Sequence, residues 1–191
     1  MKKRMVAAAM ICLVLALATP RALAAPQNSA QAAALLEQST GRVLWQSGGE
    51  TELPMASTTK VMTTLCVLDN ADLSDTVTVD SRMVGVEGSS IYLEEGEELT
   101  VEQLLLGLML RSGNDAATAL ALHTAGSIEA FADLMNNTAK DLGLEHTHFV
   151  NPHGLPASDH YTTAIELGKI TCAAYEYPAF RRIVSTKRAV I

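Results

Sequence analysis

The sequence has few aromatic residues, few cysteines and a shortage of positive charge. Of its 191 residues, 4% are aromatic, three are cysteines, and 14 lysines and arginines stand against 21 aspartates and glutamates. Because a protein that binds nucleic acid needs a basic face to hold the phosphates, this balance excludes nucleic acid as a partner. The shortage of aromatic rings leaves mainly Leu, Ala and Met to fill a core.

The first residues have the pattern of a secretory signal peptide. A basic start, "MKKRM", precedes the apolar run "VAAAMICLVLALA" and a small-x-small site at Ala22 and Ala24. We therefore expect a signal peptide over residues 1–24, cleaved near Ala24–Ala25, and a mature chain that is secreted to the periplasm or cell wall. The apolar run is shorter than a membrane span, and a retained anchor is the alternative. Without residues 1–24 the chain keeps ten basic and 21 acidic residues, a formal charge of −11.

Two cysteines follow the predicted signal peptide, Cys66 and Cys172. Both fall in apolar patterns with helical spacing, where cysteine usually packs as a small hydrophobic side chain. We expect two buried thiols, although the predicted oxidising location also permits a disulfide between them.

Strand patterns come early in the mature chain, and helical patterns follow. Residues 32–50 contain two short apolar segments around Ser39-Thr40-Gly41, which predicts a hairpin. Thr100 and Gln103 have the spacing of a capping box at the start of a helix. The full set of predictions is an α+β domain with strands in 32–50, 75–80 and 88–100, helices in 57–70, 100–110, 116–126, 127–143 and 162–177, and a loop over 144–161.

Ser57 and Lys60 stand three residues apart where the helix over 57–70 begins. At about 100° per residue, this spacing places both side chains on one helical face. A serine hydroxyl becomes a good nucleophile when a nearby base accepts its proton, and a lysine becomes that base when burial lowers its pKa. The alternative is that Ser57 only caps the helix and Lys60 is solvated.

A polar turn, Ser112-Gly113-Asn114, interrupts two hydrophobic helical patterns. A loop between two rigid helices can present the Ser112 hydroxyl and the Asn114 amide to a cleft. The alternative is a simple connector, in which Gly and Asn are present because they tolerate the backbone geometry of a turn.

Together the two elements form the pattern S-x-x-K followed by S-x-N, which is typical of penicillin-recognising serine acyltransferases. The words "PMASTTKVMT", "GSSIYLEEGEELTVEQLLLGLMLRSGNDAATALA", "MNNTAKDLGLEHTHFVNPHGL" and "DHYTTAIEL" closely resemble the D-alanyl-D-alanine carboxypeptidases, the low-molecular-mass penicillin-binding proteins. The resemblance runs from about residue 29 to the last residue. It implies the penicillin-binding/β-lactamase-like fold, an antiparallel sheet with flanking helices.

The resemblance also implies roles for individual residues. Ser57 is then the acyl-ester nucleophile and Lys60 the general base. Ser112 relays a proton to or from the leaving group, and Asn114 forms a hydrogen bond with the peptide backbone of the substrate. The implied substrates are peptidoglycan stem peptides that lose a terminal D-Ala, the implied inhibitors are β-lactam antibiotics, and no cofactor is expected.

One motif of the resembled family is missing. Its third motif, Lys-Thr-Gly, has no match here, because Lys187 is followed by Arg-Ala. We therefore expect residues 25–191 to be an incomplete serine carboxypeptidase domain that lacks its C-terminal strands, with membrane association only through that missing part. A non-catalytic remnant that binds peptidoglycan or a partner is the alternative. A β-lactamase is disfavoured, because the E-x-x-L-N loop that supplies its deacylating Glu is absent.

Four histidines lie close together in the sequence: His146, His148, His153 and His160. Clustered imidazoles occur at zinc sites. No H-E-x-x-H pattern or cysteine pair accompanies them, however, so we expect no metal site.

Overall fold

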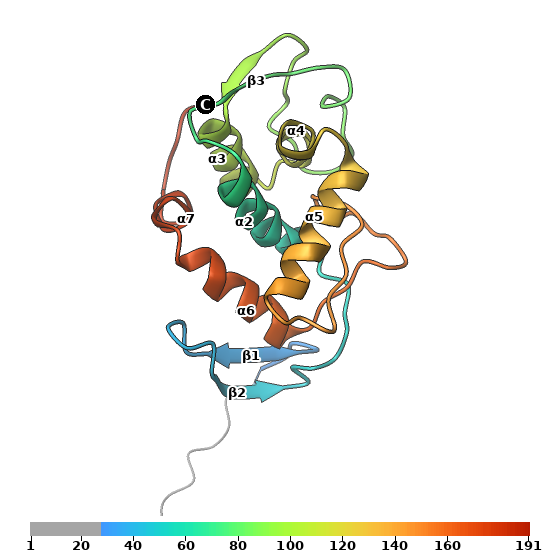
Figure 1. Cartoon of the computed structure of the whole chain (residues 1–191), viewed down its shortest axis with the longest axis vertical. Helices are drawn as coiled ribbons and strands as arrows, with labels where there is room; N and C mark the ends of the chain where they lie inside the picture. The colour runs from blue at the N-terminus through green and yellow to red at the C-terminus, as the bar shows by residue number, and fades with distance from the viewer. Residues whose placement is uncertain (1–27) are drawn as a thin grey trace, which may run out of the picture. The chain divides into compact units, whose positions relative to one another are not determined.

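Helix α2 (Lys60–Asn70) runs through the middle of the fold and contacts each of the helices α3 to α7 (Figure 1). In this computed structural model, residues 28–191 are described, and residues 31–191 form one unit. The predicted signal peptide, residues 1–24, lies outside the described residues. The α2 side chains Met62, Leu65, Cys66 and Val67 are all buried, so this helix is the centre of the core.

Two small antiparallel sheets accompany the helices. Strands β1 (Ala33–Leu36) and β2 (Val43–Ser47) form the predicted hairpin, and its turn contains Gly41 with a positive φ of 67°. Strands β3 (Thr76–Thr78) and β4 (Glu98–Thr100) pair at the opposite end of the fold. The strand predicted over 75–80 is confirmed in shorter form. The prediction over 88–100 is wrong for most of its length, because only Glu98–Thr100, after the turn at Gly96, forms a strand.

The helical predictions are also confirmed. The capping box at Thr100 and Gln103 is present, and Ser127 and Thr163 cap the helices that follow them. One helix, which begins at Pro178, was not predicted. The helices after α2 are α3 (Val101–Arg111), α4 (Asn114–Ala125), α5 (Ile128–Asp141), α6 (Ala164–Tyr175) and α7 (Pro178–Val184).

Helix α4 packs against α2, α3 and α5. Its first eight residues are all buried, and four of these are alanines: Ala116, Ala117, Ala119 and Ala121. Small side chains allow neighbouring helices to approach closely. The packing of α4 against α2 brings the start of α4, with the Ser-Gly-Asn turn, toward the start of α2.

Cys66 and Cys172 are both free thiols, as expected. The prediction that both are buried is confirmed for Cys66 only, because Cys172 is half-buried. Within residues 28–191, no helix combines the length and the apolar character needed to cross a membrane.

Candidate active site

Ser57 lies in a short 3-10 helix, η1 (Ala56–Thr59), which leads directly into α2. No side chain forms a capping hydrogen bond at the start of either helix, so the interpretation of Ser57 as a helix cap is wrong. Its side chain is exposed, and its Oγ accepts a hydrogen bond of 3.3 Å from the Lys60 Nζ. The exposed Ser57 hydroxyl thus lies next to the buried Lys60 amine.

The Lys60 amine is buried in a polar cage, and the residue is only 2% exposed. Besides Ser57 Oγ, its Nζ donates to the Asn114 Oδ1 at 2.8 Å and to the His153 carbonyl oxygen at 2.7 Å. These three acceptors match the three N–H donors of an ammonium group. Burial lowers the pKa of Lys60 to about 8, so about a tenth of the amine is neutral at pH 7 and can accept a proton.

Asn114 is the first residue of α4 and is also buried. Its Oδ1 accepts from Lys60, and its Nδ2 donates to the Glu87 carbonyl at 2.6 Å. The Asn114 backbone N–H donates to the Ser89 carbonyl at 2.7 Å. The family resemblance implies that this amide bonds the substrate; in the structure it holds Lys60 and the segment before Ile91.

Ser112 ends helix α3 with a left-handed backbone, at a φ of 58°. Its backbone N–H donates to the Gly107 carbonyl, and its side chain is half-buried. Among residues 28–191, the Ser112 hydroxyl forms no hydrogen bond with another side chain or with the backbone. The structure therefore joins Ser57, Lys60 and Asn114 directly, and it places Ser112 in the same turn as Asn114 without bonding it to them.

Asp115 was not predicted as a site residue, yet it holds one wall of the site in place. Its carboxylate is buried and accepts from the Ser90 hydroxyl at 2.5 Å and from the backbone N–H groups of Ile91 and Leu93 at 3.1 and 3.2 Å. These bonds explain why no strand forms over 89–93. In the sequence, Asp115 is only an acidic residue in the first turn of a helix, where negative charge is generally favoured, and this does not indicate which groups it holds.

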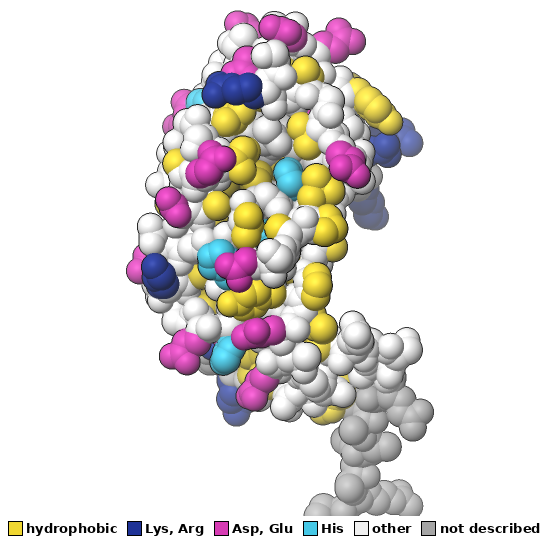
Figure 2. Space-filling view, turned by 90° about the vertical axis from the view of Figure 1, so that its right-hand side faces the viewer, with side chains coloured by type: hydrophobic (Ala, Val, Ile, Leu, Met, Phe, Trp, Pro, Cys, Tyr) yellow, Lys and Arg dark blue, Asp and Glu magenta, His cyan; other side chains and the backbone are white. Residues whose placement is uncertain are grey.

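The four clustered histidines point to different partners. His146 faces Glu52, His148 faces Asp159, and His160 bonds to Thr59. In Figure 2 the histidine side chains on this face appear at several places rather than as one cluster, and some of them lie beside acidic side chains. Across residues 28–191, no three His, Cys, Asp or Glu side chains come together as a metal site requires.

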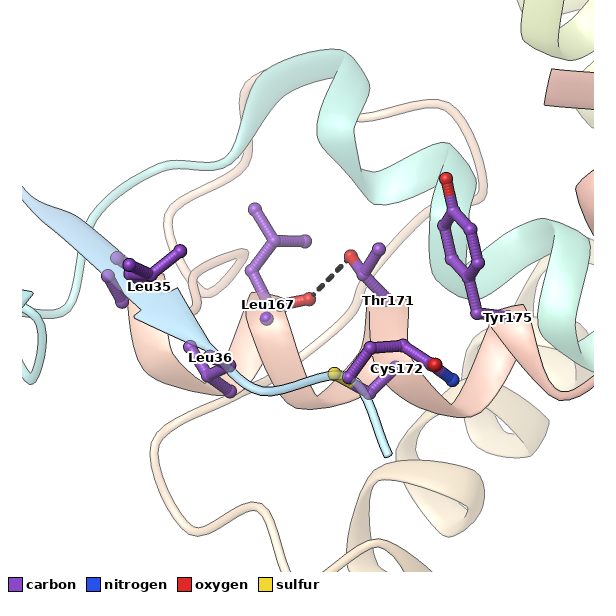
Figure 3. A pocket seen from close by; sticks show the side chains of 10 residues that line it. Leu35, Leu36, Leu167, Thr171, Cys172 and Tyr175 are labelled. Carbon is purple, nitrogen blue, oxygen red and sulfur yellow. Dashed lines mark hydrogen bonds between the residues drawn. The ribbon is translucent and has the colours of Figure 1, made fainter. Parts of the chain in front are cut away.

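A groove of about 510 Å³ lies between β1 and α6, away from these residues (Figure 3). Its lining is mainly apolar, with Leu36 and Leu167 among its side chains, together with the Cys172 thiol. None of the predicted site residues lines this groove, so it is not a part of the candidate active site.

The fold and the serine–lysine pair place the chain in the class of penicillin-binding proteins. A crystal structure of a D-alanyl-D-alanine carboxypeptidase from Mycobacterium tuberculosis is similar with a TM-score of 0.84 and 34% identity, over 88% of this chain and 64% of that one. Penicillin binding protein 6B from Escherichia coli is also similar, with a TM-score of 0.84 and 32% identity, over 90% of this chain and 58% of that one. These likenesses confirm the predicted α+β, penicillin-binding type of fold.

A family model described as D-alanyl-D-alanine carboxypeptidase, peptidase family S11, matches residues 19–190. The chain belongs to this family, which confirms the resemblance found in its motifs. The D-alanyl-D-alanine carboxypeptidase DacF of Bacillus subtilis is 37% identical over 164 residues, 83% of this chain and 42% of the relative. The corresponding enzyme of Streptomyces sp. K15 is 36% identical over 183 residues, 89% of this chain and 63% of the relative. The chain thus spans less than two thirds of the length of these relatives.

Replacing Asp115 by Asn is expected to lower the free energy of unfolding by about 1–3 kcal/mol. Both carboxylate oxygens face donors, so either orientation of the amide turns its NH₂ group toward another donor. Urea unfolding measures the effect. Asp133→Asn, at an exposed position of α5, is the matched control and should change stability by less than about 0.5 kcal/mol; equal losses in both variants would contradict the assignment.

The free energy of unfolding is expected to fall as the pH drops from about 6.5 to about 4. Burial lowers the pKa of both His153 and His160 from 6.5 to about 4. In this window the unfolded chain therefore binds more protons than the folded chain, and acid favours unfolding. Urea titrations at a series of pH values measure the slope, which should become flatter in the double variant His153→Gln/His160→Gln. In the control His146→Gln it should not become flatter, because His146 is exposed and Glu52 raises its pKa.

Proposed function

We propose that this protein is a serine-type D-alanyl-D-alanine carboxypeptidase that removes the terminal D-Ala from peptidoglycan stem peptides. One observation carries the proposal: the exposed Ser57 Oγ lies 3.3 Å from the Nζ of Lys60, an amine whose pKa is lowered by burial. Membership of the carboxypeptidase family supports the choice of substrate.

In the proposed acylation step, Ser57 Oγ attacks the carbonyl carbon of the penultimate D-Ala while neutral Lys60 accepts its proton. The backbone N–H of Ser57 donates to the oxyanion that forms. When the C–N bond breaks, the leaving amine of the terminal D-Ala takes up a proton, which passes from Lys60 by way of the Ser112 hydroxyl. An ester between Ser57 and the shortened peptide results.

Water then attacks the ester carbonyl, and Lys60 accepts a proton from that water. The Ser57–carbonyl bond breaks, Lys60 returns its proton to Ser57 Oγ, and the shortened peptide leaves with a free carboxylate. We assign to Asn114 a hydrogen bond with the peptide backbone of the substrate, in addition to its bond with Lys60. β-Lactam antibiotics acylate the same serine. The proposed reaction uses no metal or cofactor and takes place outside the cytoplasm.

The first test is covalent labelling with a fluorescent penicillin. The protein is expected to become labelled. Ser57→Ala is expected to abolish the label, because the oxygen that is acylated is lost. Ser47→Ala, at an exposed position of strand β2, is the matched control and should keep the label. A folded chain that takes no label would contradict the proposal and favour a non-catalytic module that binds peptidoglycan.

The rate of labelling is expected to rise with pH and to reach a plateau, with a midpoint at about 8, the pKa of Lys60. Only the neutral amine accepts the Ser57 proton, so the active fraction grows as Lys60 loses its charge. Stopped-flow measurement of acylation at a series of pH values between 6 and 9.5 gives the profile. Lys60→Arg should reduce the rate by at least about 10², because guanidinium stays protonated throughout this range. A flat profile would refute the role of Lys60 as base.

A further inference from the structure

A second chain of hydrogen bonds lies behind Ser57 and takes no part in the proton transfers proposed above. His160, at the end of the loop over 144–161, is only 4% exposed. Its Nε2 lies 2.8 Å from the Thr59 hydroxyl oxygen, which in turn lies 2.7 Å from the Ala56 carbonyl oxygen. The chain therefore ends one residue before Ser57.

The other ring nitrogen fixes the direction of this chain. The Val150 backbone N–H donates to Nδ1 of His160 at 3.0 Å, so Nδ1 carries no proton. In a neutral imidazole the proton is then on Nε2, which donates to Thr59, and the Thr59 hydroxyl donates to the Ala56 carbonyl. Burial, together with the nearby His148, lowers the pKa of His160 to about 4, so the ring is neutral near pH 7.

The Ala56 carbonyl belongs to a strained turn. Ala56 has a φ of 45°, in the left-handed region that residues with a Cβ rarely adopt. On its other side Gly154 lies so close that a Cβ on this glycine would stand 1.9 Å from the Ala56 oxygen. The carbonyl is thus held between the Gly154 backbone and the Thr59 hydroxyl. The same loop places the His153 carbonyl on Lys60.

We propose that His160 is a positioning residue for Ser57: through Thr59 it fixes the turn at Ala56, and by closing its own loop it fixes the carbonyl that holds Lys60. This inference rests on the proposed role of Ser57 as the nucleophile. The imidazole of His160 then fixes the position of Ser57, the nucleophile, relative to Lys60, the base, by contacts on both residues' segments. Loss of this control slows acylation, because small displacements of reacting groups cost large factors in rate.

Two variants of His160 test separately the two hydrogen bonds that its ring forms, with Val150 and with Thr59. An Asn amide reaches the position of Nδ1 and keeps the bond to Val150, but it falls short of Thr59. A Gln amide reaches the position of Nε2 and still donates to Thr59. At pH 7.5 the rate constant for acylation by labelled penicillin is expected to fall at least about tenfold in His160→Asn, which loses the bond to Thr59. It is expected to recover only in part in His160→Gln, which keeps that bond but loses the one to Val150.

The partner hydroxyl gives a parallel test. Thr59→Val should slow acylation as much as His160→Asn does, and Thr59→Ser should keep the wild-type rate. The control is Thr58→Val: the Thr58 hydroxyl donates to the Met55 carbonyl in the same turn but has no bond to His160. Thr58→Val should therefore keep the wild-type rate. Rates are compared at equal folded fraction. If the two His160 variants, the two Thr59 variants and Thr58→Val all acylate at the same rate, the proposal is overturned.

Two measurements test the positioning role without penicillin. Two-bond ¹H–¹⁵N spectra should show His160 as the neutral Nε2–H tautomer at pH 7, and an Nδ1–H tautomer or a cation overturns the proposal. A crystal structure of His160→Asn should show Ala56 outside the left-handed region; an unchanged turn with Ser57 still beside Lys60 also overturns it. A wild-type chain that takes no label refutes the proposed function, and these two measurements still decide the role of His160.

Discussion

The site depends on the burial of one amine. Lys60 is 2% exposed and lies at the start of the central helix α2. Placing an ammonium group in such a position costs several kcal/mol unless acceptors replace its water. The structure offsets this cost with three oxygens and also lowers the pKa of the amine to about 8. The burial that costs the fold free energy also lowers the pKa of Lys60, which suits this amine to the proposed role of general base.

The three oxygens come from distant parts of the chain. Ser57 is adjacent in sequence, Asn114 begins helix α4, and His153 lies in the long loop before helix α6. The amine is therefore satisfied only when α2, α4 and this loop are packed together. Folding therefore assembles the site. If any of the three segments were misplaced, the buried Lys60 amine would lose a hydrogen-bond acceptor.

Local sequence signals predicted most of the fold and part of the site. The hairpin, the capping box at Thr100 and the helices could be predicted, because each depends on short patterns among neighbouring residues. The pairing of Ser57 with Lys60 followed from their spacing, and the place of Asn114 from family resemblance. The contribution of His153 could not be predicted, because it comes from a backbone carbonyl, which every residue has. The contribution of Asp115 could not be predicted either, because only the folded loop shows which N–H groups it must satisfy.

The backbone conformation near the site also depends on contacts with distant parts of the chain. Within residues 28–191, three residues other than glycine have a left-handed φ: Ala56, Tyr92 and Ser112. Ala56 precedes the candidate nucleophile, Ser112 is the candidate proton relay, and Tyr92 lies within the segment that Asp115 holds, between Ile91 and Leu93. Such conformations cost about 1–3 kcal/mol each and persist only where surrounding contacts fix them.

In each case those contacts are visible. Gly154 and the Thr59 hydroxyl hold the Ala56 carbonyl, the Ser90 hydroxyl accepts from the Tyr92 backbone N–H, and the Ser112 backbone N–H is bonded to a carbonyl of helix α3. Two of these turns lie at the starts of the packed helices, Ala56 in the turn that leads into α2 and Ser112 just before α4. The contacts that fix them therefore also fix where the hydroxyl groups of Ser57 and Ser112 lie.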